Sequence, residues 1–473
     1  MRILFIQQDV FENYGVMILS SILKYEGHKC DIIVEALEKN PIQSVINYKP
    51  DLVCFSISSA RANWMKNLAK KIKSILNAPI VIGGSHSTFF PEIIENASID
   101  VVCIGEGEQA IVELVDKIEK GKDITKIKNL WVKKNNKIYK NPVRNLIENL
   151  DTIPSADRFL YMKYPYFRSK NTDIVMATRG CPYNCNFCFN KQYNDLYKGK
   201  GSIVRKHSVS RVISEIRDCM AKKKNVNHLY FYDDTFFLGP MAWFDEFFAR
   251  YKQEVGLPFS ITMRANLINE DIIRKLKNVK CTTIRIGIES ANPYLREKIL
   301  KKGITNEQIV NASRLIKKYG IMLQVYNIIG VPGETIETAL ETYEMSEKIH
   351  PTYAWCSLMQ PYPGTEIAEI AKRENLIEKT FNIDSLDNSY FNTLPLNFKD
   401  KKQMIALQRM FQVGNAFRIP KSLMKYLIKI PPNIIFDQIF KINYGLSVKK
   451  MDNLSWMNLI KTAYFSIDYF SKK

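Results

Sequence analysis

Short β-branched runs alternate with helical stretches along most of this chain, and this alternation constrains its fold more than any other feature. Within the first 120 residues five such runs occur, at residues 2–6, 30–34, 51–57, 79–84 and 100–105. Strands joined by helical crossovers run parallel, because the helix returns the chain to the end of the sheet at which the previous strand began. The pattern therefore predicts a doubly wound α/β domain, in which ligands bind beyond the carboxyl ends of the strands.

A second series of strands and helices begins near residue 172. Its predicted strands are residues 172–180, 226–232, 258–264, 281–289, 321–330 and 352–360. Helical patterns fill the gaps between them, including residues 304–319 and 334–349. Six parallel strands of this kind predict a partial βα barrel, whose functional residues lie at the carboxyl ends of its strands.

The changes of pattern divide the chain into four segments. We expect a doubly wound domain at residues 1–125, a hairpin and linker at 126–170, a barrel at 171–390 and a basic, mainly helical domain at 391–473. The hairpin should turn at Asn135 and Asn136, because this residue type tolerates left-handed backbone conformations. A length of 473 residues agrees with about three folded domains.

Membrane spans and a disulfide framework are both disfavoured by the sequence. No uninterrupted apolar run reaches the roughly 18 residues that a membrane span needs, and the first residues lack the long apolar core of a secretion signal. The nine cysteines are an odd number, and most occur singly in apolar strands, as Cys54 and Cys103 do. This usage is typical of free thiols, so we expect a cytoplasmic protein.

The formal net charge of +20 points to nucleic acid, an anionic membrane surface or acidic ligands as partners. Half of this net charge comes from residues 391–473, which contain fourteen Lys and Arg but only four Asp. Modification of transfer RNA is one activity that would explain it. No recognisable RNA-binding signature is present, however, so we do not expect nucleic acid as a partner.

Three cysteines are concentrated in one loop directly after the first predicted barrel strand. The segment TRGCPYNCNFCFN contains Cys181, Cys185 and Cys188. Three thiolates at this spacing can ligate three irons of a cubane cluster and leave the fourth iron open for another ligand. Two alternatives are a zinc site and small buried hydrophobic residues. Zinc would normally need a fourth ligand nearby, and the nearest histidine, His207, lies nineteen residues beyond Cys188.

The motif CPYNCNFC, which follows a strand and the tripeptide TRG, resembles the cluster motif of the radical S-adenosylmethionine superfamily. The resemblance covers about residues 173 to 365. It implies a 4Fe-4S cluster in a partial βα barrel, with S-adenosylmethionine chelated on the open iron and cleaved reductively to a 5′-deoxyadenosyl radical. It also implies an electron donor such as flavodoxin or ferredoxin, and it places Phe187 against the adenine.

Further matches to this superfamily fall at the ends of the later strands. The segment YFYDDTF resembles the part that contacts the methionine amino group, through Asp233 or Asp234. By the same resemblance, Glu289 in RIGIES would contact the ribose or the methionyl group, and Gly330 in GVPGET would approach the nucleoside. Arg264 suits a bidentate contact with the methionyl carboxylate. Each segment taken alone could instead be a helix cap or a turn.

The first domain lacks G-x-G-x-x-G after its first strand, so a nicotinamide dinucleotide is not expected. The segments FSISS, IGGSH and GEGE instead resemble the cobalamin-binding domain that precedes many radical S-adenosylmethionine barrels. The resemblance implies contacts with the nucleotide tail of cobalamin from Ser56, Ser58, Gly83, Gly84, His86, Gly105 and Glu106. The alternative is a doubly wound domain whose glycines only form turns.

The loop after the first strand departs from the motif that supplies a lower cobalt ligand in other cobalamin proteins. It reads QQDVFENYGVM and contains no histidine. We therefore expect a bound cobalamin without a histidine ligand, with Asn13, Tyr14 or a neighbour on its lower face. His86 is the alternative ligand, although a histidine at a strand end more often makes a hydrogen bond.

Together these features predict a cobalamin-dependent radical S-adenosylmethionine enzyme that methylates an unactivated carbon of a small molecule. Radical cyclisation, ring rearrangement or oxidation without methyl transfer is the alternative reaction, and a non-catalytic cobalamin sensor is the alternative from another class. The motifs do not identify catalytic residues. They also leave the substrate open.

The C-terminal segment combines apolar residues at helical spacing with lysines. Its apolar positions include Leu423, Tyr426, Leu427, Ile430, Ile434, Ile435 and Ile439, and its lysines include Lys421, Lys425, Lys429 and Lys441. Such a stripe usually packs on its parent domain. It can also lie on an anionic bilayer, and we expect a peripheral membrane contact and a hydrophobic or amphiphilic substrate.

Overall fold

The computed structural model describes residues 1–387, 389–451 and 456–465. Its residues form two compact units. Unit 1 consists mainly of Met1–Ser169 together with Tyr193–Ile203, and unit 2 contains Lys170–Gln192 and the described part of Val204–Ala463. The predicted α/β class is confirmed, with a doubly wound sheet, a parallel barrel sheet and C-terminal helices.

Unit 1 is built around one seven-stranded sheet in the order β2-β1-β3-β4-β5-β6-β7. Its strands are β1 (Arg2–Gln7), β2 (Lys29–Val34), β3 (Leu52–Ser56), β4 (Ile80–Gly83), β5 (Val101–Cys103), β6 (Leu130–Lys134) and β7 (Lys137–Lys140). The first five are parallel, and both β2 and β3 pair with β1. Because the strand order reverses at β1 and β3, the crevice for a ligand lies beyond their carboxyl ends.

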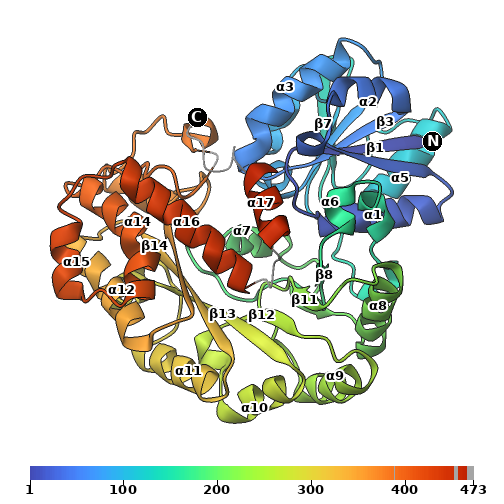
Figure 1. Ribbon diagram of the computed structural model, residues 1–473. Helices are drawn as coiled ribbons and strands as arrows, with labels where there is room; N and C mark the ends of the chain where they lie inside the picture. Colours follow the sequence, from blue (N-terminus) through green and yellow to red (C-terminus); the bar gives the residue numbers. More distant parts are fainter. Residues whose placement is uncertain (388, 452–455, 466–473) are drawn as a thin grey trace. The chain divides into compact units, whose positions relative to one another are not determined.

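Helices connect and cover these parallel strands (Figure 1). They are α1 (Tyr14–Tyr25), α2 (Pro41–Tyr48), α3 (Ala62–Lys73), α4 (Ser85–Phe89), α5 (Glu108–Glu119) and α6 (Pro165–Arg168). The predicted hairpin is confirmed: its turn residues Asn135 and Asn136 have φ angles of 52° and 56°. Its strand β6 pairs antiparallel with β5, so the hairpin extends the sheet.

Unit 2 contains a six-stranded sheet in the order β15-β14-β13-β12-β11-β8, with every neighbouring pair parallel. The strands are β8 (Thr172–Val175), β11 (His228–Phe231), β12 (Phe259–Met263), β13 (Cys281–Glu289), β14 (Met322–Ile329) and β15 (Tyr353–Leu358). A short antiparallel pair, β9 (Thr178–Arg179) and β10 (Arg205–Lys206), lies beside it. The predicted partial barrel is confirmed.

The connecting helices of unit 2 run along the outer side of this curved sheet (Figure 1). They are α8 (Val209–Lys222), α9 (Met241–Glu254), α10 (Glu270–Asn278), α11 (Asn306–Lys318) and α12 (Ile336–Ile349), and α13 (Glu366–Arg373) follows the last strand. Between them and the strands lies one large apolar core. Helix α11 begins with a capping box, in which Thr305 and Gln308 satisfy each other's backbone N–H groups.

The C-terminal helices are α14 (Lys401–Phe417), α15 (Lys421–Leu427), α16 (Ile434–Met451) and α17 (Trp456–Phe465). Helix α14 packs on strand β15, and α16 packs on α14. Trp355 of β15 contacts the rings of Phe391 and Tyr444, at centroid distances of 4.9 and 5.3 Å. The remainder of the basic segment that we predicted, residues 452–455 and 466–473, lies outside the described residues. Among the described residues, no helix is both long and apolar enough to cross a membrane.

Candidate cofactor-binding sites

The cysteine loop lies in unit 2, between β9 and helix α7 (Asn190–Leu196). Cys181 and Cys185 are buried, Cys188 is half-buried, and all three are free thiols. The backbone N–H of Cys188 donates to the carbonyl of Cys185 at 3.1 Å, and the N–H of Asn190 donates to Cys188 Sγ at 3.5 Å. The loop is therefore folded back on itself, with its thiols beside backbone N–H donors that favour a thiolate.

Asn186, which stands between two of these cysteines, anchors the loop. Its side chain is buried, and its Nδ2 donates to the carbonyl of Ile299 at 2.8 Å. Its backbone N–H donates to the carbonyl of Leu300 at 3.0 Å, and its own carbonyl accepts from Ile367. Sequence reasoning missed this residue, because an asparagine between cysteines carries no signal of a long-range contact.

The donor set of the loop fits a cluster. Burial raises the pKa of the Cys188 thiol to about 11, and it raises the pKa of Cys181 as well. Such thiols stay neutral until a cation binds beside them. Within the described ranges, no three His, Cys, Asp or Glu side chains are grouped as ligands of one metal ion. Three thiolates of a cubane cluster bind three different irons, so they need not share one ion.

The two adjacent acids after β11 have different environments. Asp233 is buried and accepts hydrogen bonds from the backbone N–H and the hydroxyl of Thr178, both at 2.5 Å. Burial raises its pKa to about 6. Asp234 is exposed. Burial is the main cause of the raised pKa values of Cys181 and Cys188, and the negative charge of Asp234 raises them further. The charge of Asp234 therefore acts on the cysteines, whereas Asp233 holds the strand that leads into their loop.

Arg264, at the end of β12, lies against the cysteine loop. Its Nη1 is 3.9 Å from Cys185 Sγ, and its guanidinium carbon lies 3.6 Å from the ring centre of Tyr183. The same group donates to the carbonyls of Lys302 and Gly303. Stacking on an aromatic face and donation to two carbonyls hold this guanidinium in a fixed position. Its contact with the methionyl carboxylate stays a prediction.

Glu289, at the end of β13, forms an ion pair that the sequence did not predict. Lys302 Nζ lies 2.8 Å from Glu289 Oε1, with the two side chains 11% and 8% exposed. Lys302 Nζ also lies 5.7 Å from the ring centre of Phe187. A Cβ atom on Gly287 would collide with both charged groups, so this glycine makes room for the pair. A lysine in KKGIT carries no pattern that would reveal such a partner.

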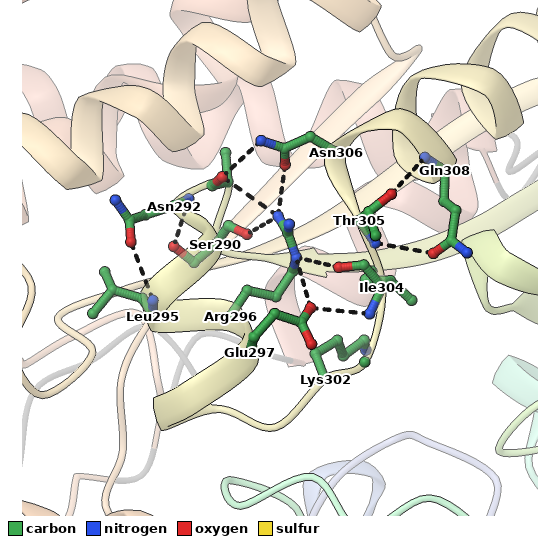
Figure 2. A network of polar contacts seen from close by, with 12 residues as sticks. Ser290, Asn292, Leu295, Arg296, Glu297, Lys302, Ile304, Thr305, Asn306 and Gln308 are labelled. Carbon is green, nitrogen blue, oxygen red and sulfur yellow. Dashed lines mark hydrogen bonds and ion pairs between the residues drawn. The ribbon is translucent and has the colours of Figure 1, made fainter.

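A buried arginine holds the segment that carries Lys302. Arg296 is 1% exposed, and its guanidinium donates to the carbonyls of Ser290 at 2.9 Å and Ile304 at 2.6 Å (Figure 2). It also donates to Asn306 Oδ1 at 2.7 Å. The N–H of Lys302 in turn donates to the carbonyl of Arg296 at 3.0 Å. The network therefore joins the end of β13 to the start of α11 and presents Lys302 to Glu289.

Gly330, expected to approach the nucleoside, is packed against protein. Its φ angle is 89°, and a Cβ atom there would collide with the buried Leu394. Its N–H and that of Val331 donate to Glu334 Oε2, at 2.5 and 3.2 Å. Burial raises the pKa of Glu334 to about 8. The glycine is thus required by the turn and by Leu394, and a ligand contact for it stays a prediction.

In unit 1, the ends of β3 and β4 approach each other closely. Gly84 has a φ angle of 96°, and a Cβ atom there would lie 2.7 Å from the carbonyl oxygen of Ile57 and 3.1 Å from Ser56 Oγ. Gly83 accepts a hydrogen bond from the N–H of Ile57 at 3.0 Å. Gly84 and Ser58 are exposed. This edge is therefore small and hydroxyl-bearing, which fits the nucleotide tail of cobalamin.

The loop after β1 is held by buried tyrosines and by its neighbours. Asn13 caps α1 by accepting from Val16, and its Nδ2 donates to Ser56 Oγ at 3.2 Å. Tyr161 is fully buried, accepts from the N–H of Asn13 at 3.0 Å and donates to Gln7 Oε1 at 2.6 Å. Tyr14 is 7% exposed. Since Asn13 and Tyr14 are used within the fold, their place at the lower face of cobalamin stays a prediction.

His86 is 2% exposed, and its Nδ1 lies 3.1 Å from Ser59 Oγ. Its ring packs on Phe90 with a centroid distance of 5.2 Å. These contacts are with protein side chains, so the tail contact and the alternative ligand role of His86 both stay predictions.

Gly105 and Glu106, at the end of β5, contact a segment from far along the chain. The N–H of Glu106 donates to the hydroxyl of Tyr197 at 2.9 Å, and a Cβ atom on Gly105 would collide with that hydroxyl. The carboxylate of Glu106 accepts from the N–H of Ile147 at 3.1 Å. Both residues therefore serve a contact within unit 1, and their contact with cobalamin stays a prediction.

Comparison with protein families matches both units. Residues 175–346 match the model described as the Radical SAM superfamily, and residues 8–115 match the B12 binding domain. A protein described as an uncharacterized methyltransferase from Pyrococcus horikoshii is 35% identical over 77% of this chain and 79% of its own length. The anaerobic magnesium-protoporphyrin IX monomethyl ester cyclase of Rubrivivax gelatinosus is 27% identical, over 74% of this chain and 65% of that protein.

Solved structures share the fold. The cobalamin-dependent S-adenosylmethionine radical enzyme OxsB, with aqua-cobalamin bound, superposes with a TM-score of 0.72 at 16% identity, covering 99% of this chain and 79% of that one. The radical S-adenosylmethionine methyltransferase TsrM from Kitasatospora setae gives 0.67 at 19% identity, over 79% and 76% of the two chains. The chain therefore belongs to the radical S-adenosylmethionine superfamily, among the members that carry a B12-binding domain, and its cofactors are a 4Fe-4S cluster, S-adenosylmethionine and cobalamin.

Proposed function

We propose that this protein methylates an unactivated carbon of a small hydrophobic or amphiphilic molecule. The observation that carries the proposal is the presence, in one chain, of a complete cysteine loop and a B12-binding unit, together with 35% identity to a methyltransferase. A non-catalytic sensor would not need three cysteines in a loop with Arg264, Glu289 and Lys302 close to it.

The net reaction balances with two molecules of S-adenosylmethionine and two electrons. One C–H bond of the substrate breaks, and its hydrogen leaves in 5′-deoxyadenosine while methionine is released. One C–C bond forms with a methyl group from the second molecule, which leaves as S-adenosylhomocysteine. When bound, the cluster and the cobalamin supply the electron transfer and the methyl transfer. We infer that flavodoxin or ferredoxin supplies the two electrons, because the described residues form no second cysteine cluster for this task.

The side chains near the cysteine loop would bind and orient S-adenosylmethionine. In this proposal Arg264 pairs with its carboxylate, and Asp234, not the buried Asp233, faces its amino group. Glu289 accepts from the nucleoside while Lys302 fixes the orientation of that carboxylate. Charged groups that are held before the ligand arrives lose little entropy on binding, which favours a defined geometry.

The test is product analysis with the reconstituted full-length protein, a low-potential reductant and candidate substrates. We expect a product heavier by one CH₂, with 5′-deoxyadenosine and S-adenosylhomocysteine formed in equal amounts. Cyclisation is the second candidate, because a cyclase is 27% identical to this chain. A product without the added carbon, formed without S-adenosylhomocysteine, would establish that reaction and contradict methyl transfer.

We also propose a peripheral membrane contact through helix α16. One face of the helix packs on α14, with Phe436 and Phe440 buried and the ring of Phe440 against that of Phe391. The exposed hydrophobic residues of the helix are Ile434, Ile435, Ile439, Ile442 and Leu446, from 37% to 73% exposed. Three lysines, Lys441, Lys449 and Lys450, belong to the same helix. Apolar side chains beside lysines favour an anionic bilayer surface, and each basic residue there adds about 1 kcal/mol.

Co-sedimentation of the full-length protein with vesicles tests this contact. We expect binding to phosphatidylglycerol vesicles at low salt, weaker binding to phosphatidylcholine and a clear loss in the Ile435→Glu variant. Ile75→Glu, at a similarly exposed isoleucine of unit 1, serves as the control. Equal recovery of wild type and Ile435→Glu with anionic vesicles would exclude this face of α16 as the contact.

A further inference from the structure

The segment Tyr193–Ile203, here called the coupling segment, belongs to unit 1 although it lies within the sequence of unit 2. The chain leaves unit 2 after Gln192 and returns to it at Val204. The segment begins five residues after Cys188, the last cysteine of the cluster loop. The structure therefore joins the cluster loop by a short stretch of chain to residues that fold with the B12-binding unit.

Tyr197 fixes this segment to the loop after β5. Its side chain is 1% exposed, and its hydroxyl accepts hydrogen bonds from the N–H of Glu106 at 2.9 Å and from Asn129 Nδ2 at 3.4 Å. Asn129 also donates to the carbonyl of Ile104 at 2.8 Å. Because a Cβ atom on Gly105 would collide with the hydroxyl, the glycine and the tyrosine require each other.

The rest of the coupling segment is also bound to unit 1. The carbonyl of Lys200 accepts from the N–H of Leu146 at 2.7 Å, and the N–H of Ser202 donates to Glu148 Oε1 at 2.9 Å. Tyr193, Leu196 and Ile203 pack against the apolar core of the unit, in which Tyr197 itself is a buried member. The segment thus has specific partners along its length, and its position depends on the loops that it contacts.

We infer that the coupling segment links the cobalamin site to the cluster loop, with Tyr197 as its positioning residue. The inference rests on cobalamin binding by unit 1. A ligand that orders the loop after β5 also orders the residues packed on it, and order in the coupling segment restricts the chain that leads back to Cys188. Linkage makes the effect reciprocal, so a loaded cluster should also raise the affinity for cobalamin.

The experiment measures the dissociation constant of hydroxocobalamin for two forms of the full chain. One form carries the reconstituted cluster, and the other carries the Cys181→Ala, Cys185→Ala and Cys188→Ala substitutions. We expect the loaded form to bind about fivefold more tightly or better, the lower end of typical coupling factors. In the Tyr197→Phe background, which keeps the ring and removes the hydroxyl, the ratio should fall toward one.

Tyr48→Phe is the matched control, because its hydroxyl donates to the carbonyls of Ile3 and Lys29 at the amino ends of the same sheet. This variant should keep the wild-type ratio. Hydrogen exchange gives a second readout: cobalamin should slow exchange in residues 189–203 of the wild type, and less so in Tyr197→Phe. Equal ratios in wild type and Tyr197→Phe, or no change in exchange, would overturn the coupling. A wild-type protein that binds no cobalamin would instead contradict the function itself.

Discussion

The loops that follow the strands are built differently in the two units. In unit 1 the loops after β3 and β4 consist of small residues in close backbone contact, as Gly84 is with Ile57. In unit 2 they carry charged side chains that converge near the cysteines, as Arg264 and the Glu289–Lys302 pair do. A buried network around Arg296 holds part of this arrangement in place.

We propose that the difference reflects what each site binds. A long nucleotide tail needs space and backbone hydrogen bonds along a sheet edge, which side chains would block. A zwitterionic ligand at a reactive cluster needs charges in preset positions. Substitutions should therefore act through space and backbone in unit 1, and through charge and ligand donation in unit 2.

The largest effect is expected at the cluster. Cys185→Ala removes one of three thiolates, so anaerobically reconstituted protein should lose the cluster, against about four irons per chain in the wild type. Iron and sulfide analysis with electron paramagnetic resonance measures this. Cys281→Ala, at a buried free cysteine of β13, should keep its iron. A full cluster in Cys185→Ala would contradict the assignment.

Loss of the buried Arg296 should destabilise the segment between β13 and α11. Arg296→Met leaves the carbonyls of Ser290 and Ile304 and the side chain of Asn306 without this donor. We expect the free energy of unfolding to fall by about 3 kcal/mol, because each buried group left unsatisfied costs about 1 kcal/mol or more. Denaturant titration measures the loss. The exposed Arg314→Met should change stability by less than about 0.5 kcal/mol.

Alanine substitutions at two glycines of unit 1 should distinguish the cost of steric crowding from the cost of a strained backbone angle. Gly84 and Gly27 both have positive φ angles, of 96° and 87°, but a Cβ atom on Gly27 would meet nothing within 4 Å. Both alanine variants are strained at this φ angle. Gly84→Ala should cost about 2 kcal/mol more than Gly27→Ala, since it also overpacks against the backbone of Ile57. Equal melting temperatures for the two variants would show that space does not limit this edge.

The ion pair of unit 2 should affect ligand affinity more than stability. Lys302→Met frees the carboxylate of Glu289 from its fixed orientation, and we expect S-adenosylmethionine to bind about tenfold more weakly, a change of about 1.4 kcal/mol. Equilibrium dialysis with cluster-loaded protein measures this. Lys301→Met, an equal change of charge at the exposed neighbour, is the control, and Lys302→Arg should restore part of the affinity. Unchanged binding in Lys302→Met would remove Lys302 from the site.

The last effect is gradual: the stability of unit 2 should depend on pH. Burial raises the pKa of Glu334 to about 8 in the folded protein, whereas an unfolded chain releases this proton near pH ~4.3. Between these values the folded state holds more protons, so its stability falls as pH rises. Glu334→Gln removes this titration and should gain roughly 1 kcal/mol per pH unit relative to wild type between about pH 5 and 8. Denaturant titration of wild type and Glu334→Gln at several pH values measures this slope, and parallel pH profiles would contradict the prediction.

Local sequence patterns were sufficient to predict much of the fold. The alternation of runs and helices predicted both sheets, and Asn135 and Asn136 predicted the turn of the hairpin. The assignment of the three cysteines as cluster ligands also rests on local spacing, and it stays a prediction. These features depend on neighbouring residues, because periodicity, turn conformation and loop spacing act over a few positions.

Contacts between distant residues were decided only by the tertiary structure. Asp233 rather than Asp234 bonds to Thr178, and the place of Lys302 depends on the buried Arg296. The contact of Gly105 with Tyr197 joins positions 92 residues apart, and no local pattern indicated it. A glycine, an acid or a lysine has the same local signature whether its partner is a cofactor or another part of the chain, and only the packed fold distinguishes the two.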